Sequence, residues 1–177
     1  ERSMNNLFDI RGKVALVTGG SRGIGEMIAA GFLANGVKVY ISSRKAEVCN
    51  ATAARLMEQF GGECISLPAN LAEVTGCQQL ADELAARESQ LDILINNAGV
   101  SWGAPIDDFP ESGWDKVMDT NVKGVFFLTQ KLLPLLRQSG SAEDPARVVN
   151  VGSIDGLKNP VFETFSYGPS KAALHHL

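Results

Sequence analysis

The sequence predicts an α/β fold, a doubly wound parallel sheet covered by helices in three α/β/α layers. Three observations predict it. Short apolar runs alternate with longer helical patterns along the chain, several of these runs are apolar on both faces, and the first run ends in a cluster of glycines. The chain has 177 residues, of which 45% are hydrophobic, so it can bury one core, and we expect residues 1–177 to form a single domain.

Five strands and the helices between them follow from hydrophobic periodicity. The expected strands are residues 13–18, 37–42, 63–69, 91–96 and 146–151. The expected helices are residues 24–34, 46–60, 76–88 and 121–137, with a further helix beginning at Tyr167. This order is typical of a Rossmann-like domain. The helix over 121–137 is apolar around much of its circumference, so it is either buried deeply in its own domain or in contact with another subunit.

Composition excludes several classes of partner. Charged residues make up 20% of the chain and the net charge is -4, so there is no basic surface for nucleic acid or an anionic membrane. No window reaches the roughly 18 consecutive apolar residues of a spanning helix. The three cysteines, Cys49, Cys64 and Cys77, are widely spaced and form no CxxC pair. We therefore expect a cytoplasmic protein without nucleic-acid partner, membrane segment or metal site.

A glycine-rich segment, TGGSRGIG at residues 18–25, follows the first strand and opens the first helix. At such a junction the pyrophosphate of a dinucleotide meets free backbone N–H groups and the positive end of the helix dipole. Gly19, Gly23 and Gly25 let the backbone approach a phosphate without obstruction by Cβ atoms. The segment predicts a dinucleotide-binding turn.

The end of the second strand indicates which dinucleotide is bound. Proteins that bind NAD normally offer Asp or Glu to the ribose hydroxyls there, whereas this chain has Ser42, Ser43, Arg44 and Lys45. Arg44, together with Arg22 of the glycine turn, can form charge-assisted hydrogen bonds to a 2′-phosphate. The sequence therefore favours NADP(H).

Three residues after the fifth strand suggest acid–base chemistry. Tyr167 and Lys171 share one face of a helix, and a neighbouring ammonium stabilises the phenolate form of a tyrosine. Ser153 closes the fifth strand at the carboxyl edge of the sheet, where ligands bind in such folds. Its hydroxyl can polarise a carbonyl group.

With these motifs the whole chain resembles the short-chain dehydrogenases/reductases. TGGSRGIG is similar to the cofactor turn of that family, and Asn96 to Gly99 read NNAG, as its members do after the fourth strand. Ser153, Tyr167 and Lys171 match the family's catalytic triad, and Asn121 matches its fourth catalytic residue. Within the family the chain is most similar to NADPH-dependent 3-oxoacyl-thioester (β-ketoacyl-ACP) reductases of the rhamnolipid-synthesis type.

The resemblance implies reduction of a ketone to a secondary alcohol with NADPH, on a small-molecule or acyl-thioester carbonyl substrate, by a homodimer or homotetramer. Tyr167 would donate the proton, Lys171 would activate it and hold the nicotinamide ribose, Ser153 would bind the substrate carbonyl, and Asn121 would anchor a water in a proton relay. The implied cofactor-binding residues are Gly19, Ser21, Arg22, Gly23, Ile24, Gly25, Ser43, Arg44, Asn70, Leu71, Asn97, Ala98, Gly99, Tyr167 and Lys171.

The sequence departs from the family pattern at three places. Asn70 replaces the usual Asp that meets the adenine amino group, and Asp155 puts a carboxylate either beside the substrate or in solvent. The sequence ends at Leu177, so we expect a domain truncated after the fifth strand and the start of the following helix. His175 and His176 are adjacent, face different directions and indicate packing or surface positions rather than a metal site. Two alternative functions stay open: an NAD(P)-dependent dehydrogenase of a steroid, sugar or polyol alcohol, and a non-catalytic nucleotide-binding fragment.

Overall fold

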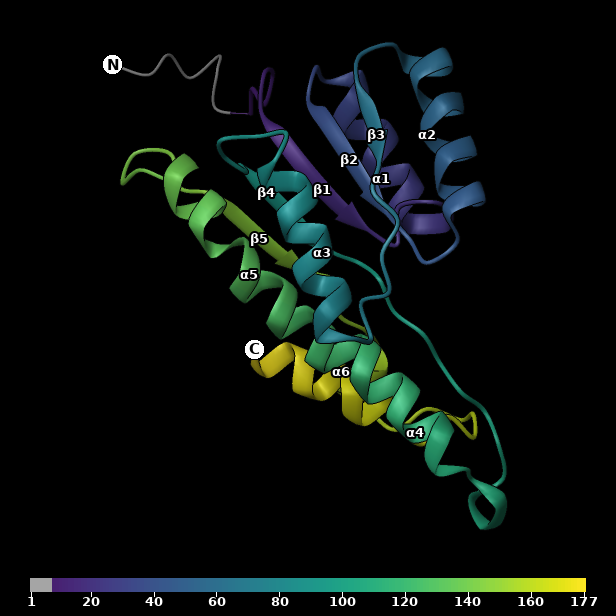
Figure 1. Cartoon of the computed structure of the whole chain (residues 1–177). Helices are drawn as coiled ribbons and strands as arrows, with labels where there is room; N and C mark the ends of the chain where they lie inside the picture. The colour runs from purple at the N-terminus through teal and green to yellow at the C-terminus, as the bar shows by residue number, and fades with distance from the viewer. Residues whose placement is uncertain (1–7) are drawn as a thin grey trace.

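The computed structural model describes residues 8–177, which form one parallel five-stranded sheet with helices on both faces (Figure 1). The strands are β1 (Val14–Thr18), β2 (Lys38–Ser42), β3 (Cys64–Ser66), β4 (Ile93–Asn96) and β5 (Arg147–Asn150). Their order across the sheet is β3-β2-β1-β4-β5, so the winding direction reverses between β1 and β4. The predicted doubly wound α/β fold is confirmed.

The helices form the two outer layers. They are α1 (Gly23–Ala34), α2 (Ala46–Phe60), α3 (Val74–Ala85), α4 (Glu111–Met118), α5 (Gly124–Ser139) and α6 (Tyr167–His176), with short turns η2 (Ile106–Asp108), η3 (Asp119–Lys123) and η4 (Ile154–Gly156). α1 and α2 cover one face of the sheet and α3 and α5 the other, while α4 and α6 lie toward the end to which the strands point (Figure 1). None of the helices in the described residues is long and apolar enough to span a membrane.

Alternation along β1 builds both halves of the core. Leu16 packs in the cluster with α3 and α5, whereas Ala15 and Val17 pack in the cluster with α1 and α2. In the sheet register Leu16 lies between Tyr40 of β2 and Leu94 of β4. Because both faces are covered, these strands are apolar at successive positions, which is the pattern seen in the sequence.

The apolar helix expected over residues 121–137 begins later, at Gly124, and follows the π-helical turn η3. Leu128, Leu132 and Leu136 of this helix pack into the core beside α3, and Val125 is also buried. Phe126 is 48% exposed. Most of the apolar surface of this helix is thus buried within its own domain, and Phe126 lies outside that core.

β5 is an outer strand of the described sheet and pairs with β4. Val148 and Val149 of β5 are 43% and 46% exposed, so this outer edge of the described sheet is apolar. At the amino ends of the strands, Asp144 joins β1 to β5: its carboxylate lies 2.9 Å from Nζ of Lys13 and 2.6 Å from Nη1 of Arg147. This ion cluster and the ligand-binding end of the sheet are at opposite ends of the strands.

Candidate active site

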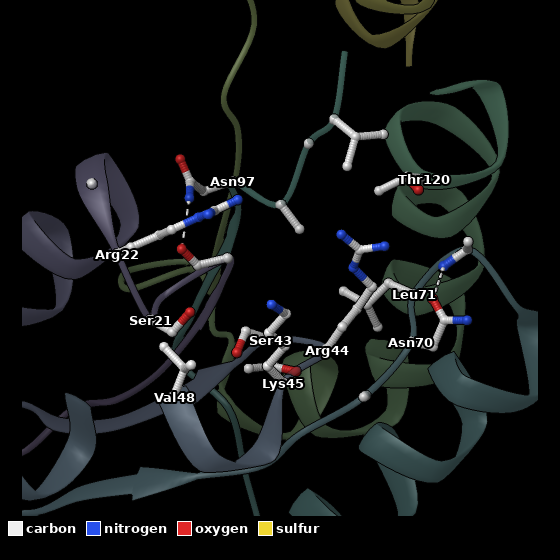
Figure 2. A pocket seen from close by; sticks show the side chains of 18 of the residues that line it. Ser21, Arg22, Ser43, Arg44, Lys45, Val48, Asn70, Leu71, Asn97 and Thr120 are labelled. Carbon is white, nitrogen blue, oxygen red and sulfur yellow. Dashed lines mark hydrogen bonds between the residues drawn. The ribbon is translucent and has the colours of Figure 1, made fainter. Parts of the chain in front are cut away.

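A cleft of about 510 Å³ opens at the carboxyl ends of the strands, beside the point where the winding reverses. Its walls come from the turn after β1, the ends of β2 and β3, the segment after β4 and the turn η3 (Figure 2). The lining contains most of the expected cofactor-binding residues, namely Gly19, Ser21, Arg22, Gly23, Ile24, Ser43, Arg44, Asn70, Leu71, Asn97, Ala98 and Gly99. Gly25, Tyr167 and Lys171 do not line it.

The glycine turn uses three of its glycines for different reasons. Gly19 and Gly23 have φ angles of 62° and 55°, in the left-handed region that side chains disfavour. A Cβ atom on Gly25 would overlap the carbonyl oxygen of Gly19 and lie 2.6 Å from Nδ2 of Asn97. These contacts bring the first turn of α1 to the cleft, where its free N–H groups favour an anionic ligand.

Thr18, at the end of β1, fastens the glycine turn to the segment after β4. Its Oγ1 accepts hydrogen bonds from the backbone N–H groups of Asn97 (3.0 Å) and Ala98 (2.9 Å) and donates to the carbonyl oxygen of Ile95 (3.3 Å). Nδ2 of Asn97 in turn donates to the carbonyl oxygen of Thr18 (3.1 Å). Two walls of the cleft are therefore held at a fixed separation.

The cleft carries positive charge. Arg22, Arg44 and Lys45 line it, and no Asp or Glu is among its lining residues. Neither arginine lies within 4.0 Å of a carboxylate in residues 8–177. Figure 2 shows the Arg44 side chain extending from the end of β2 into the cleft. The Ser43 hydroxyl is buried without a hydrogen-bond partner in the described chain. Two guanidinium groups and an unpaired hydroxyl suit a phosphate group.

Asn70 lies at the far wall of the cleft, between β3 and α3 (Figure 2). Its Nδ2 donates to Oε1 of Glu73 (2.7 Å), and its Oδ1 accepts a long bond of 3.4 Å from the N–H of Ala72. The oxygen keeps capacity for a second donor because an amide oxygen has two lone pairs. Asn70 can therefore accept a hydrogen bond from a ligand, as a carboxylate would at this position.

Lys171 is buried, with 4% of its surface exposed. Its Nζ donates to the carbonyl oxygen of Val151 (2.8 Å) and lies 5.7 Å from the centre of the Tyr167 ring. Burial lowers the pKa of the Lys171 ammonium below its usual value. A Cβ atom on Gly99 would lie 3.5 Å from this Nζ and 3.5 Å from Oδ1 of Asn121. Because Gly99 lines the cleft, the lysine sits at one end of it.

Asn121 lies in the π-helical turn η3 and is fully buried. Its Oδ1 accepts from the N–H of Val100 (2.8 Å), and its Nδ2 donates to the carbonyl oxygen of Val100 (2.9 Å) and to Oγ of Ser170 (3.0 Å). Ser170 donates to the carbonyl oxygen of Tyr167 (2.7 Å). The side-chain amide of Asn121 is therefore occupied by protein partners, and it joins the cleft wall to α6.

Ser153 follows β5 and precedes the turn η4. Its N–H donates to Nε2 of His175 (3.2 Å), and its Oγ accepts from the N–H of Asp155 (3.2 Å). Because the hydroxyl oxygen is the acceptor in that bond, its proton remains available for a ligand oxygen. The contacts of Ser153, Val151 and Asn121 with α6 bring the four expected catalytic residues to one region, beside the cleft.

Sequence reasoning missed several residues of the site. Ser170 and His175 contact the expected catalytic residues, and no local pattern marks them because their partners are 49 and 22 positions away. The cleft lining also includes Ser42, Lys45, Val48, Ala69, Ala72, Val100 and Thr120. Most of these are neighbours in sequence of expected residues, so extending each motif by a few positions would have found them.

The match to known proteins defines the class. Residues 13–177 match the sequence profile described as short chain dehydrogenase, and this chain belongs to that family. Among its relatives is the rhamnolipids biosynthesis 3-oxoacyl-[acyl-carrier-protein] reductase of Pseudomonas aeruginosa, which is 52% identical over 174 residues, 98% of this chain and 67% of the relative. Gluconate 5-dehydrogenase of Gluconobacter oxydans is 37% identical over 154 residues, 84% of this chain and 56% of the relative.

The fold matches solved structures over almost its whole length. The RhlG/NADP active-site complex of Pseudomonas aeruginosa superposes with a TM-score of 0.91 at 53% identity, covering 96% of this chain and 65% of that one. A putative short chain dehydrogenase of Escherichia coli CFT073 complexed with NADPH gives a TM-score of 0.85 at 31% identity, covering 95% and 69%. This chain thus spans about two thirds of the length of these two structures.

Proposed function

We propose that this chain supplies the cofactor-binding and catalytic residues of an NADPH-dependent reductase that converts a 3-oxoacyl thioester, on acyl carrier protein or coenzyme A, to the secondary alcohol. One observation carries the proposal. The cleft reaches Gly99, where a Cβ atom would contact both Lys171 and Asn121. Lys171, which would stabilise the phenolate of Tyr167, and Asn121, which joins the cleft wall to α6, therefore lie at the end of a cleft that suits a dinucleotide. We also propose that residues 1–177 form one dinucleotide-binding domain, of which residues 1–7 lie outside the described residues.

The cleft fits NADP(H) better than NAD(H). Gly25 packs the first turn of α1 against the Gly19 carbonyl, which holds the N–H groups of that turn at the cleft for the pyrophosphate that NADP(H) and NAD(H) share. Arg22 and Arg44 would bind the 2′-phosphate, with the unpaired Ser43 hydroxyl beside them. The absence of Asp and Glu from the described lining removes the usual partner of the NAD ribose. The similar Pseudomonas aeruginosa structure is itself an NADP complex.

The catalytic residues divide the work of carbonyl reduction. NADPH, when bound, supplies a hydride to the carbonyl carbon. Tyr167 donates its phenol proton to the carbonyl oxygen, and the Lys171 ammonium stabilises the phenolate that remains. The free proton of the Ser153 hydroxyl donates to the same oxygen as negative charge develops on it. Asn121 holds the cleft wall against α6 through its two bonds to Val100 and its bond to Ser170.

The substrate class rests on similarity to two reductases. The Pseudomonas aeruginosa enzyme named above is 52% identical, and a 3-oxoacyl-[acyl-carrier-protein] reductase of Synechocystis is 33% identical over 146 residues. A sugar or polyol dehydrogenase is the second candidate, because gluconate 5-dehydrogenase is 37% identical. The first candidate is favoured by its higher identity and its greater coverage of this chain.

We further propose that the enzyme is cytoplasmic and forms a homodimer or homotetramer. The three cysteines are free thiols and buried, which fits a reducing compartment. Phe126 leaves an aromatic ring exposed on α5, as a subunit contact requires. Sedimentation of the whole protein as encoded tests the assembly.

A substrate panel tests the function. The whole protein is assayed with 3-oxoacyl thioesters of several chain lengths, with 5-ketogluconate and with a steroid ketone, each with NADPH and with NADH. We expect NADPH oxidation with the 3-oxoacyl thioesters. Turnover of only the sugar ketone would establish the second candidate instead. Tight NADPH binding without turnover of any ketone would show a non-catalytic nucleotide-binding protein.

A further inference from the structure

His175 contacts the segment that carries Ser153 although it lies 22 positions later in the chain. It is in the last turn of α6, and its Nε2 accepts a hydrogen bond of 3.2 Å from the backbone N–H of Ser153. Within residues 8–177, Nε2 of His175 is the hydrogen-bond acceptor of the Ser153 N–H. The contact thus joins the end of the helix to the backbone of an expected catalytic residue.

The His175 side chain is exposed, and its imidazole ring lies closely against the turn that carries Ser153. A Cβ atom on Gly152 would overlap the ring, with Cδ2 only 2.6 Å away, and a Cβ on Gly156 would lie 2.8 Å from Cε1. The His175 ring thus approaches the turn that carries Ser153 at two glycines, Gly152 and Gly156. A side chain at Gly152 would displace the His175 ring from Ser153, whereas one at Gly156 would also meet the backbone of α6, at N of Ala172 and C of Lys171, both at 2.8 Å.

The helix places His175 in line with the residues that carry the chemistry. Tyr167, Lys171 and His175 are spaced by four positions, so they form one stripe along α6. Tyr167 is the proposed proton donor, and Nζ of Lys171 lies 5.7 Å from the centre of its ring. His175 accepts the hydrogen bond from the Ser153 N–H. This stripe of α6 thus includes Tyr167 and Lys171 and contacts Ser153. Asn121 is bonded to Ser170 of the same helix.

We propose that His175 is a positioning residue for Ser153, an inference that rests on the proposed carbonyl-reductase function. The bond to Nε2 fixes the Ser153 backbone, and the bond from the Asp155 N–H then fixes its Oγ. With both set, the Ser153 hydroxyl keeps its proton free for a substrate oxygen. Accepting at Nε2 requires the neutral imidazole that carries its proton on Nδ1. Without the His175 imidazole, the Ser153 N–H loses this hydrogen bond, and we expect the Ser153 hydroxyl to adopt several orientations.

Kinetics of three variants of the whole protein test the role. His175→Phe keeps the ring volume and removes the acceptor, His175→Gln keeps an acceptor near the position of Nε2, and His176→Phe is the matched control on the adjacent exposed residue. We expect His175→Phe to lower kcat for ketone reduction about three- to tenfold, the range of one hydrogen bond. The KM for NADPH stays unchanged, His175→Gln recovers most of the loss, and His176→Phe behaves as wild type.

Amide hydrogen exchange tests the contact without using activity. We expect the Ser153 amide to exchange faster in His175→Phe than in wild type or His176→Phe, while the core amide of Leu16 keeps its protection. Unchanged Ser153 exchange would overturn the contact, and faster exchange with unchanged kcat would overturn the positioning role. If the wild type reduces no ketone, the proposed function fails, and the exchange rates still decide whether His175 holds Ser153.

Discussion

At the scale of single residues, the phenol of Tyr167 is the group whose loss separates chemistry from binding. Tyr167→Phe removes one oxygen from a helix whose backbone contacts stay in place. Because the proton is needed only as the substrate oxygen gains charge, we expect kcat to fall by roughly 10²- to 10⁴-fold while NADPH affinity is preserved. Steady-state kinetics and a fluorescence titration with NADPH measure the two effects. Full activity in this variant would remove Tyr167 from the mechanism.

Arg44 is the residue on which cofactor choice is expected to depend. It extends into the cleft and has no carboxylate partner in the described residues, so its charge is available to a ligand. Arg44→Asp replaces an attraction for the 2′-phosphate by a repulsion, and we expect NADPH binding to weaken by roughly 10- to 100-fold while NADH binding is kept. Arg137→Asp, an equal change of charge in the last turn of α5, is the control. An unchanged NADPH/NADH ratio would assign the discrimination to Arg22.

At the scale of elements, the packing of α1 requires a glycine at one position and tolerates a side chain at another. A Cβ on Gly25 would overlap the Gly19 carbonyl, whereas a Cβ on Gly31 of the same helix meets no atom within 4 Å. We expect Gly25→Ala to lower the free energy of unfolding by about 1–3 kcal/mol and to abolish nucleotide binding. Gly31→Ala should raise it by about 0.5–1 kcal/mol. Urea unfolding and NADPH titration check both; equal behaviour of the two variants would contradict the close contact.

The ion cluster between β1 and β5 gives a pH-dependent stability. The hydrogen bond from Lys13, with that from Arg147, lowers the pKa of Asp144 from 3.8 to about 2. A carboxylate with a depressed pKa in the folded state stabilises the fold above pH 3.8, and this contribution is lost as the pH falls to about 2. We expect Asp144→Asn to unfold at lower urea concentration than wild type at pH 7 and most of this difference to disappear at pH 2, where Asp144 is about half protonated in the folded state. Glu143→Gln, on the neighbouring exposed residue, should match wild type at both values.

At the scale of the whole molecule, the outer edge of β5 decides how the 177-residue chain behaves in isolation. Val148 and Val149 are nearly half exposed on an edge strand of the described sheet, and an edge strand is a template for pairing with another strand. We expect this chain, purified alone, to self-associate as its concentration rises and Val149→Lys to reduce the association. Val161→Lys, a 94% exposed residue outside the sheet, is the control. Equal sedimentation of all three proteins would show that the edge is not the contact.

The fold and the cofactor cleft could be predicted from sequence because their signals are local. The run of apolar residues in β1, the glycine turn after it and the missing carboxylate after β2 each lie within a few positions. The turn η3 could not be predicted, because residues 119–123 continue a helical pattern and nothing in it marks a π turn. The bonds of Asn121 to Ser170 and of Ser153 to His175 could not be predicted either, since they depend on how separate elements pack.

The side-chain amide of Asn121 has a consequence for how such enzymes change substrate over evolution. It ties the cleft wall at Val100 to α6 at Ser170, so in the proposed enzyme the residues on α6 that would move the proton are fastened to the cofactor cleft by contacts within this chain. Selection can then alter the surrounding segments that recognise a substrate without having to rebuild the chemistry. The two relatives described above are named for a 3-oxoacyl-[acyl-carrier-protein] and for gluconate, two unlike substrates, which agrees with such a separation of chemistry from recognition.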